Sequence, residues 1–248
     1  MYDEEESLIP SANFIAFFSI GLFILFNVLL NMFFTIYEDA SIFGVKTKLP
    51  IILLKDWRYC SVCEVNTPPR SFHCHICNKC ILKRYNHCMF LGKCCGYSNA
   101  RYYFLFLIYT WLATVYCNLL NAEYIYELMH GFGLKTLFVT LMPMLAWILG
   151  FVDNLRLLTV FVNTTCLITF FILFFYLILN LKLLKSGQTW FEKANNVYFN
   201  NIKTANLKSN IIETFGTNWY LTIFVPFVKH NLPSDGTHFE INENIKNI

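Results

Sequence analysis

Charged residues are scarce in this sequence: Asp, Glu, Lys and Arg make up 14% of its 248 residues, and 56% are hydrophobic. Such a composition excludes a disordered chain and an ordinary soluble domain. Charge is absent altogether from residues 14–37, 102–122 and 157–181. The first of these stretches would form about 36 Å of helix, which is enough to cross a hydrocarbon core of about 30 Å. We therefore predict three transmembrane helices.

The first residues also lack the positive charge that begins a secretory signal peptide, because positions 3–6 are acidic, so we expect no cleavable signal peptide. Acidic residues are in turn nearly absent from residues 40–101, which hold ten Lys or Arg against only Asp56 and Glu64. The positive-inside rule places this segment in the cytosol and the acidic N-terminus in the lumen. The tail after Leu181 holds seven Lys and is expected in the cytosol as well.

A fourth apolar segment, residues 134–152, does not fit this count. It contains Lys135 and Pro143, and if it crossed the membrane the basic tail would lie on the wrong side. We interpret it as a lumenal interfacial or re-entrant helix, with a true span as the alternative. We see little sign of an internal repeat. The predicted order is a lumenal N-terminus (1–13), a membrane helix (14–37), a cytosolic cysteine-rich domain (38–101), a membrane helix (102–122), a lumenal or interfacial segment (123–156), a membrane helix (157–181) and a cytosolic C-terminal region (182–248).

Cysteine is nearly absent outside one region, since eight of the ten cysteines lie between Cys60 and Cys95. The reducing cytosol disfavours disulfides, and a Cys-x2-Cys turn supplies two ligands to zinc. The pairs are Cys60 with Cys63 and Cys74 with Cys77, and His73, Cys80, His87 and Cys94 can complete two sites of three cysteines and one histidine. The alternative is unliganded buried thiols. The sequence thus predicts an α-helical integral membrane protein with a cytosolic cysteine-rich domain that binds two structural zinc ions.

The residues in and after this cluster resemble the cysteine-rich domain of the DHHC protein S-acyltransferases, the palmitoyltransferases. The resemblance rests on residues 67–74, on the cysteines and histidines that follow, and on residues 99–104. It extends to residues 189–192, similar to the family's TTxE motif with Trp190 in place of the second Thr, and to residues 210–226, similar to its C-terminal motif. The resemblance implies one zinc held by Cys60, Cys63, His73 and Cys80 and a second held by Cys74, Cys77, His87 and Cys94.

The resemblance also implies a nucleophile at Cys88. In the family, the cysteine of the Asp-His-His-Cys tetrad takes an acyl group from acyl-CoA as a thioester and passes it to a substrate cysteine. Nearby basic residues, Lys83, Arg84 and Lys93, are candidates to stabilise the thiolate and to attract the CoA phosphates. The alternatives are a structural thiol at Cys88 and, for the basic residues, a solvated face.

The tetrad of this chain departs from the family pattern, because it reads Tyr85-Asn86-His87-Cys88. The family's Asp orients the first His, which acts as general base, and Asn86 cannot take a proton. Loss of a general base typically costs about 10²–10⁴-fold in rate, although cysteine is the nucleophile that suffers least. His75 is a candidate substitute, with projection into solvent as the alternative. A leftover thiol, Cys95, is either an acylation site or inert packing.

A second departure concerns the membrane helices, since the family usually has two spans before the cysteine-rich domain and one is predicted here. An accessory subunit, the segment 134–152 or a more open acyl cavity would compensate.

These features predict a protein S-acyltransferase that moves a long-chain acyl group, palmitoyl, from acyl-CoA through a Cys88 thioester to cysteines of membrane-associated proteins. The zinc domain would face the cytosol, from the endoplasmic reticulum or Golgi membrane, and meet the cytosolic faces of its substrates. The alternative is a catalytically weak or inactive relative that acts as a zinc-stabilised membrane scaffold. Retention of Cys88 favours the enzyme, and loss of the base favours the scaffold. The spans exclude a soluble zinc finger for nucleic acid.

Overall fold

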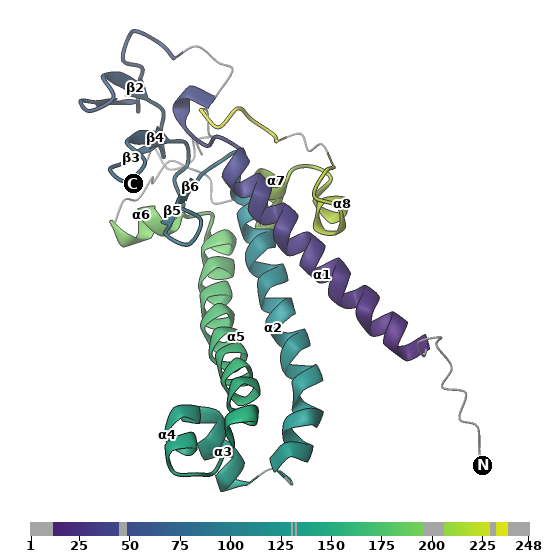
Figure 1. The fold of residues 1–248 in the computed structure, drawn as a ribbon. Coiled ribbons are helices and arrows are strands. Elements are labelled where there is room, and N and C mark those ends of the chain that lie inside the picture. The colour runs from purple at the N-terminus through teal and green to yellow at the C-terminus, as the bar shows by residue number, and fades with distance from the viewer. Residues whose placement is uncertain are drawn as a thin grey trace, which may run out of the picture. The chain divides into compact units, whose positions relative to one another are not determined.

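A computed structural model of the chain describes residues 12–44, 49–129, 131, 133–195, 206–228 and 232–237. The predicted lumenal N-terminus therefore lies almost entirely outside the described residues. Long helices and three short β-hairpins make up most of the described part (Figure 1). Two compact units are distinguished, residues 1–26 with 108–175 and residues 27–107 with 176–248, and the boundaries between them fall within the long helices.

In the described part of the chain, three helices are long and apolar enough to cross a membrane: α1 (Ala12–Tyr37), α2 (Ala100–Met129) and α5 (Asn154–Ser186). Each contains one of the uncharged stretches, and α2 and α5 continue well past theirs. The flanking positions include Arg101, Glu123, Glu127, Arg156 and Lys182. Lys, Arg and Glu are good helix formers, so the charge pattern marks where the apolar run ends but not where the helix ends.

In the first unit, the apolar segment 134–152 forms two short helices instead of the one helix predicted from the sequence. They are α3 (Leu134–Leu141) and α4 (Pro143–Ile148), separated at Met142. Pro143 starts α4, where its missing N–H costs nothing, and the same ring would clash inside a continuous helix. Eight and six residues span only about 12 and 9 Å, which is too short to cross a bilayer.

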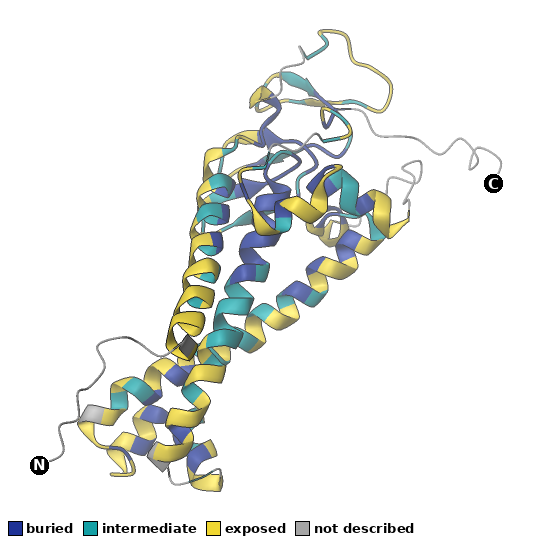
Figure 2. Ribbon diagram, turned by 90° about the vertical axis from the view of Figure 1, so that its right-hand side faces the viewer, coloured by how far each residue is buried: buried dark blue, intermediate teal, exposed yellow. Residues whose placement is uncertain are grey.

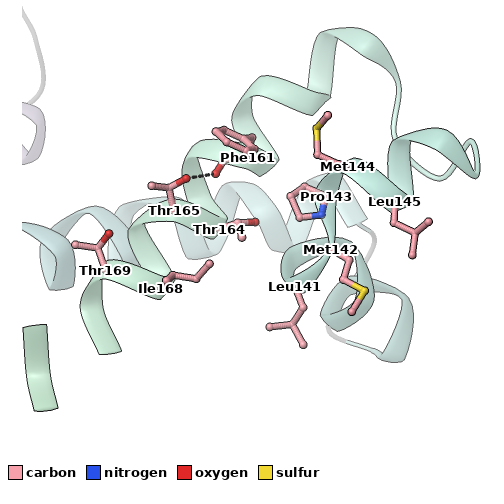
Figure 3. A pocket seen from close by; sticks show the side chains of 10 residues that line it. All are labelled: Leu141, Met142, Pro143, Met144, Leu145, Phe161, Thr164, Thr165, Ile168 and Thr169. Atoms are coloured by element: carbon pink, nitrogen blue, oxygen red, sulfur yellow. Dashed lines mark hydrogen bonds between the residues drawn. The ribbon is translucent and has the colours of Figure 1, made fainter. Parts of the chain in front are cut away.

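These two short helices pack against α5 through an apolar cluster of Val139, Ala146, Val152 and Val160. The Thr164 hydroxyl, on α5, donates to the Thr140 carbonyl at 2.6 Å, which ties α3 to α5. Figure 3 shows the open hollow beside this contact, bordered by Pro143 and by residues of α5. The lumenal position predicted for this segment stays a prediction.

The second unit contains three antiparallel hairpins of three-residue strands. They are β1 (Arg58–Cys60) with β2 (Val65–Thr67), β3 (Phe72–Cys74) with β4 (Lys79–Ile81), and β5 (Asn86–Cys88) with β6 (Lys93–Cys95). Each hairpin begins 14 residues after the last, and each has a residue with positive φ just before its second strand: Glu64, Asn78 and Gly92. The expectation of little internal repetition is thereby corrected. The repeat escapes notice in the sequence because the hairpins share ligand-type residues and little else.

Strands this short are marginal in water, so other contacts must hold the module together. Two small clusters of buried side chains lie around the hairpins, one of Ala40, Cys74, Ile81 and Cys94 and one of Ile42, Cys80, Leu82 and Tyr97. Asn99, at the start of α2, donates to the carbonyls of Thr35 and Cys94 and so joins α1 to the third hairpin. Figure 2 shows buried residues gathered in the first turns of α2 and in the part of the hairpin region next to it, whereas the first hairpin is mostly exposed or half-buried.

The remaining helices of this unit are short: the 3₁₀ turn η1 (Ile42–Gly44), α6 (Trp190–Ala194), α7 (Leu207–Phe215) and α8 (Trp219–Phe224). A helical membrane protein with a cysteine-rich domain able to hold metal was predicted, and this fold class is confirmed. The side of the membrane on which the domain lies stays a prediction.

Candidate functional site

Four ligand-type side chains meet between the first and second hairpins. The sulfur of Cys63 lies 3.3 Å from Nδ1 of His73, and the sulfurs of Cys60 and Cys80 each lie 3.8 Å from that nitrogen. The sulfurs of Cys63 and Cys80 are 3.6 Å apart. The four atoms thus enclose one small space, and we name this group the first metal cluster.

The second and third hairpins form a second metal cluster of the same design, from Cys74, Cys77, His87 and Cys94. The three sulfurs lie 3.8, 3.3 and 3.5 Å from Nδ1 of His87. In both clusters all four ligand atoms lie within 4.8 Å of one another. Zn–S bonds of about 2.3 Å and Zn–N bonds of about 2.0 Å in a tetrahedron require edges of roughly 3.5–3.8 Å, so both donor sets fit zinc.

The two clusters link successive hairpins by one rule. Each takes both cysteines of the turn of one hairpin, and a histidine and a cysteine from the next. In that next hairpin the two ligands are direct cross-strand partners, His73 with Cys80 and His87 with Cys94. A metal ion in each cluster would therefore tie the first hairpin to the second and the second to the third.

Strand β5 separates metal binding from the thiol. Successive side chains of a strand point to opposite faces, so His87 takes one face while Asn86 and Cys88 share the other. Their cross-strand partners, Cys95 and Lys93, lie on that same second face. Cys88 is half-buried and belongs to neither metal cluster.

Two tyrosines that the sequence analysis did not single out contact Asn86. The Asn86 amide donates to the hydroxyl of Tyr103 at 3.1 Å and to that of Tyr176 at 3.2 Å. The two hydroxyl oxygens are 2.7 Å apart. Tyr103 is part of the family-like stretch at residues 99–104, which was a usable signal. Tyr176 is the one tyrosine among the aromatic residues of α5, but nothing in the sequence pairs it with Asn86.

The two leftover candidates take different places. Cys95 is fully buried, and this burial raises the pKa of its thiol well above the ordinary value, so it is an inert packing residue in this conformation. His75 is exposed and its ring packs against His73, on the second hairpin. His75 therefore lies on a hairpin other than that of Cys88 and faces solvent.

Comparison with known proteins agrees with the geometry. The sequence model of the DHHC palmitoyltransferases matches residues 53–197, which is more than half of the chain. The probable palmitoyltransferase ZDHHC24 of Danio rerio is 31% identical over 228 residues, covering 90% of this chain and 75% of its own length. This chain belongs to the DHHC palmitoyltransferase family. The probable palmitoyltransferase ZDHHC24 of Rattus norvegicus is also 31% identical. Palmitoyltransferase PFA3 of Kluyveromyces lactis is 28% identical over 134 residues, which cover 50% of this chain and 41% of the length of that protein. The rat match covers 87% of this chain and 75% of that protein.

The TTxE-like segment of this DHHC family member is anchored to the hairpins by a buried ion pair. Arg70 donates from Nε and Nη2 to the two carboxylate oxygens of Glu192, at 2.6 and 2.8 Å. Burial disfavours the charged guanidinium, but the hydrogen bonds and charge of Glu192 outweigh it and raise the pKa of Arg70. Glu192 also completes a capping box with Thr189. Trp190, the residue that departs from the family motif, is partly exposed and takes no part in this contact.

The same segment reaches the tetrad directly, because the backbone N–H of Phe191 donates to the carbonyl of Tyr85 at 2.9 Å. Tyr85 holds the position of the family's Asp. Its ring packs edge-on against Phe104, and its hydroxyl lies 3.4 Å from that of Thr214. A tyrosine side chain cannot orient a base as the family's Asp does, and Tyr85 instead serves the packing of α6 and α7 against the third hairpin.

The three basic residues predicted to act near Cys88 have different surroundings in the structure. Lys83 is 3% exposed and forms an ion pair of 2.8 Å with Glu213, so its charge is used inside the protein. Arg84 donates to the His73 carbonyl at 2.7 Å and covers the ring of Phe191. Lys93 is the cross-strand partner of Cys88. These contacts do not favour Lys83 as a phosphate ligand, and they leave Lys93 nearest to the thiol.

Proposed function

We propose that this chain is a protein S-palmitoyltransferase in which Cys88 forms the acyl-enzyme thioester. The family match supports the activity, and one observation supports the residue: β5 directs His87 into the second metal cluster and leaves Cys88 on the opposite face as a free thiol. Among the cysteines between 60 and 95, six are in the metal clusters and Cys95 is fully buried, so Cys88 is the accessible thiol of the module.

The reaction then follows two balanced steps. The Cys88 sulfur attacks the thioester carbonyl of palmitoyl-CoA, the bond from that carbon to the CoA sulfur breaks, and the thiol proton leaves on the released CoA. A substrate cysteine next attacks the Cys88 thioester, takes the palmitoyl group and returns a proton to Cys88. Both steps exchange one thioester for another, so no oxidant or external energy source is required.

The other parts of the module have supporting roles in this proposal. The two metal clusters hold structural zinc ions, whose binding stabilises hairpins too small to fold by themselves. Lys93, opposite Cys88 in the hairpin, and Arg84 are the proposed cations for the CoA phosphates. The exposed hairpin tip, Met89 and Phe90, offers an apolar approach beside the thiol.

A labelling experiment tests the proposal. The purified full chain is incubated with labelled palmitoyl-CoA, and the adduct is located by mass spectrometry with and without neutral hydroxylamine, which cleaves thioesters. We expect one hydroxylamine-sensitive adduct, on Cys88, and none in Cys88→Ser. An adduct on Cys117 or Cys166, with Cys88 unmodified, would assign the reaction elsewhere. The scaffold alternative is not favoured by the family match, and it predicts no adduct at all.

The membrane orientation is part of the same proposal, supported by the excess of basic residues in residues 40–101 and in the C-terminal tail. The cysteine-rich domain and the tail would lie in the cytosol, at the endoplasmic reticulum or Golgi. Glycosylation tags placed before Phe14, between Met129 and Leu134, and in the tail test this arrangement. We expect the first two to be modified and the third to stay unmodified, and a modified tail would refute it.

An accessory subunit that supplies a further membrane helix is also proposed, on the ground that α1 is the single candidate span ahead of the hairpins in the described part of the chain. Affinity purification of the tagged chain from native membranes should then recover a stoichiometric membrane partner. Full acylation activity of the purified chain alone would show that no such subunit is needed.

A further inference from the structure

Two tyrosines from separate membrane helices converge on the tetrad position that lacks its histidine. Tyr103 lies in the first turn of α2 and Tyr176 in the last third of α5. Their hydroxyl oxygens, 2.7 Å apart, are bridged by the Asn86 amide at 3.1 and 3.2 Å. Three groups that are distant in sequence are thus brought into one closed hydrogen-bonded triangle.

The hydrogen bonds of this triangle do not use both of the tyrosine hydroxyl protons. The Asn86 amide nitrogen lies within hydrogen-bond distance of both tyrosine oxygens, and because these oxygens are only 2.7 Å apart, one N–H group of the amide faces the pair. A hydroxyl carries one proton and two lone pairs, so a bond between the two hydroxyls uses only one of their two protons. The second O–H is free of the triangle and available as a donor to a group outside it.

The Cys88 thiol lies on the same face of β5 as the hydrogen-bonded triangle. Asn86 and Cys88 share a face of β5, because they are two residues apart in a strand. Asn86 contacts both tyrosine hydroxyls, so the pair lies at the face of β5 that also carries Cys88. Attack by the Cys88 sulfur would therefore place the carbonyl oxygen of the thioester in the neighbourhood of the free O–H.

A phenol at this position suits a donor better than a base. With an ordinary pKa of about 10, tyrosine is protonated at neutral pH and does not readily accept the thiol proton. Attack on a thioester builds negative charge on the carbonyl oxygen, and a fixed hydroxyl stabilises that charge without reorganising at the moment of reaction. The Asn86 amide positions the donor, since it holds both hydroxyl oxygens in place.

We propose that the Tyr103–Tyr176 hydroxyl pair, clamped by Asn86, is the hydrogen-bond donor to the oxyanion formed when Cys88 attacks acyl-CoA. The tetrahedral intermediate carries the Cys88 sulfur, the CoA sulfur, the acyl chain and the oxyanion on one carbon. Its collapse restores the carbonyl and expels CoA, and the hydroxyl keeps its proton throughout. This inference rests on the proposed function, and it gives a role to Asn86, the residue that stands where the family has its general base.

Two reactions of the same thiol separate this role from a structural one. Acylation by palmitoyl-CoA passes through an oxyanion, whereas alkylation by iodoacetamide displaces iodide directly and forms none. Both rates are measured on the Cys88 peptide by mass spectrometry, in single-turnover conditions with saturating palmitoyl-CoA. The variants are Tyr103→Phe, Tyr176→Phe and the double variant, and the matched control is Tyr109→Phe on the same helix α2.

We expect each single variant to acylate roughly tenfold more slowly and the double variant about 10²-fold more slowly, in line with loss of an oxyanion donor. Alkylation of Cys88, half-saturation by palmitoyl-CoA and metal content should stay within about twofold of the wild type, as should all rates of Tyr109→Phe. Acylation rates that do not change would overturn the inference, and so would equal falls in acylation and alkylation. A wild-type Cys88 that is alkylated but never acylated would instead refute the proposed function, and the inference with it.

Discussion

The second and third hairpins carry the same residue types at five positions spaced 14 apart. The pairs are Arg70 and Arg84, His73 and His87, Cys74 and Cys88, Lys79 and Lys93, and Cys80 and Cys94. The backbone registers also correspond strand by strand. The hairpins differ at the second turn position, which is Cys77 in one and Leu91 in the other. The second hairpin thus has a complete Cys-x2-Cys turn and the third has half of one.

This difference shows how a structural ligand position can become a reactive one. Cys74 has Cys77 beside it and a following hairpin that presents His87 and Cys94, so its sulfur joins a cluster. Cys88 has Leu91 in place of the second cysteine, and among the described residues no fourth hairpin follows to supply the remaining ligands. The same backbone geometry therefore holds Cys88 firmly while leaving its sulfur outside both clusters.

The largest expected effect comes from making one substitution at the two equivalent cysteines. Cys74→Ala removes a ligand from the second metal cluster and should unfold the module, because structural zinc contributes about 10–16 kcal/mol to the folding of small domains. Cys88→Ala should keep two zinc ions per chain and the wild-type fold. Metal analysis and limited proteolysis of both purified variants provide the measurement. Loss of metal from Cys88→Ala would contradict the separation of the two roles.

The next effect concerns the position before the ligand histidine, which is Phe72 in the second hairpin and Asn86 in the third. Phe72 packs against Phe191, whereas Asn86 meets two hydroxyls. Asn86→His should place a base beside Cys88 but also removes the amide that holds the tyrosine pair, so we expect it to acylate faster than Asn86→Gln, by part of the 10²–10⁴-fold that a general base supplies. The rate of adduct formation with labelled palmitoyl-CoA measures it, and Asn86→Gln is the reference because it also displaces the amide from the tyrosine pair but supplies no base.

Equal acylation rates in Asn86→His and Asn86→Gln would show that proton removal from Cys88 is not the slow step. Tyr85→Asp, intended to orient the new imidazole, is a harsher change because Tyr85 is buried against Phe104. We expect it to lower stability, because Lys83, the cation that lies over the Tyr85 ring, is already paired with Glu213.

The sequence was sufficient to predict the membrane helices and the candidate ligands for a physical reason. Apolar runs and cysteine pairs are local patterns, and their meaning does not depend on the rest of the fold. Pro143 counted against a membrane span in the sequence analysis, but it was not used to divide the segment into two helices, although a proline disfavours a continuous helix at that position. The 14-residue repeat was also present but was hidden by different side chains on the same backbone.

Other features depend on contacts between segments far apart in the chain, and no local pattern predicts them. Lys83 looks like an exposed cation in the sequence, and only the packing of α7 brings Glu213 to it. Tyr176 reaches Asn86 across 90 positions. The pairing of Arg70 with Glu192 likewise spans 122 positions. Charge and hydrogen-bond partners of this kind require the folded structure.

A smaller difference is expected between the stability losses caused by alanine at the two equivalent arginines, Arg70 and Arg84. Arg70→Ala would leave the Glu192 carboxylate buried without its partner, which typically costs about 3–5 kcal/mol. Arg84→Ala would remove one hydrogen bond to the His73 carbonyl and a stacking contact with Phe191, at a cost of about 1–3 kcal/mol. Thermal unfolding of the detergent-solubilised variants compares them. Equal losses of stability would mean that Glu192 finds other partners when Arg70 is removed.

The smallest effect tests the turn where the third hairpin departs from the second. Gly92 has φ of 59°, and the equivalent Asn78 has φ of 50° with a side chain in place. A Cβ added at Gly92 would meet nothing within 4 Å, so substitution there probes backbone conformation alone. The left-handed region costs most residues about 1–2 kcal/mol, but asparagine visits it readily. The free energy of unfolding of Gly92→Asn should therefore stay within about 0.5 kcal/mol of the wild-type value. That of Gly92→Val should be lower by at least about 1 kcal/mol. Both variants should keep two zinc ions and a reactive Cys88, because neither change touches a ligand. If asparagine and valine cost the same, the third turn does not share the conformation of the second, and the parallel between the two hairpins would hold only for their strands.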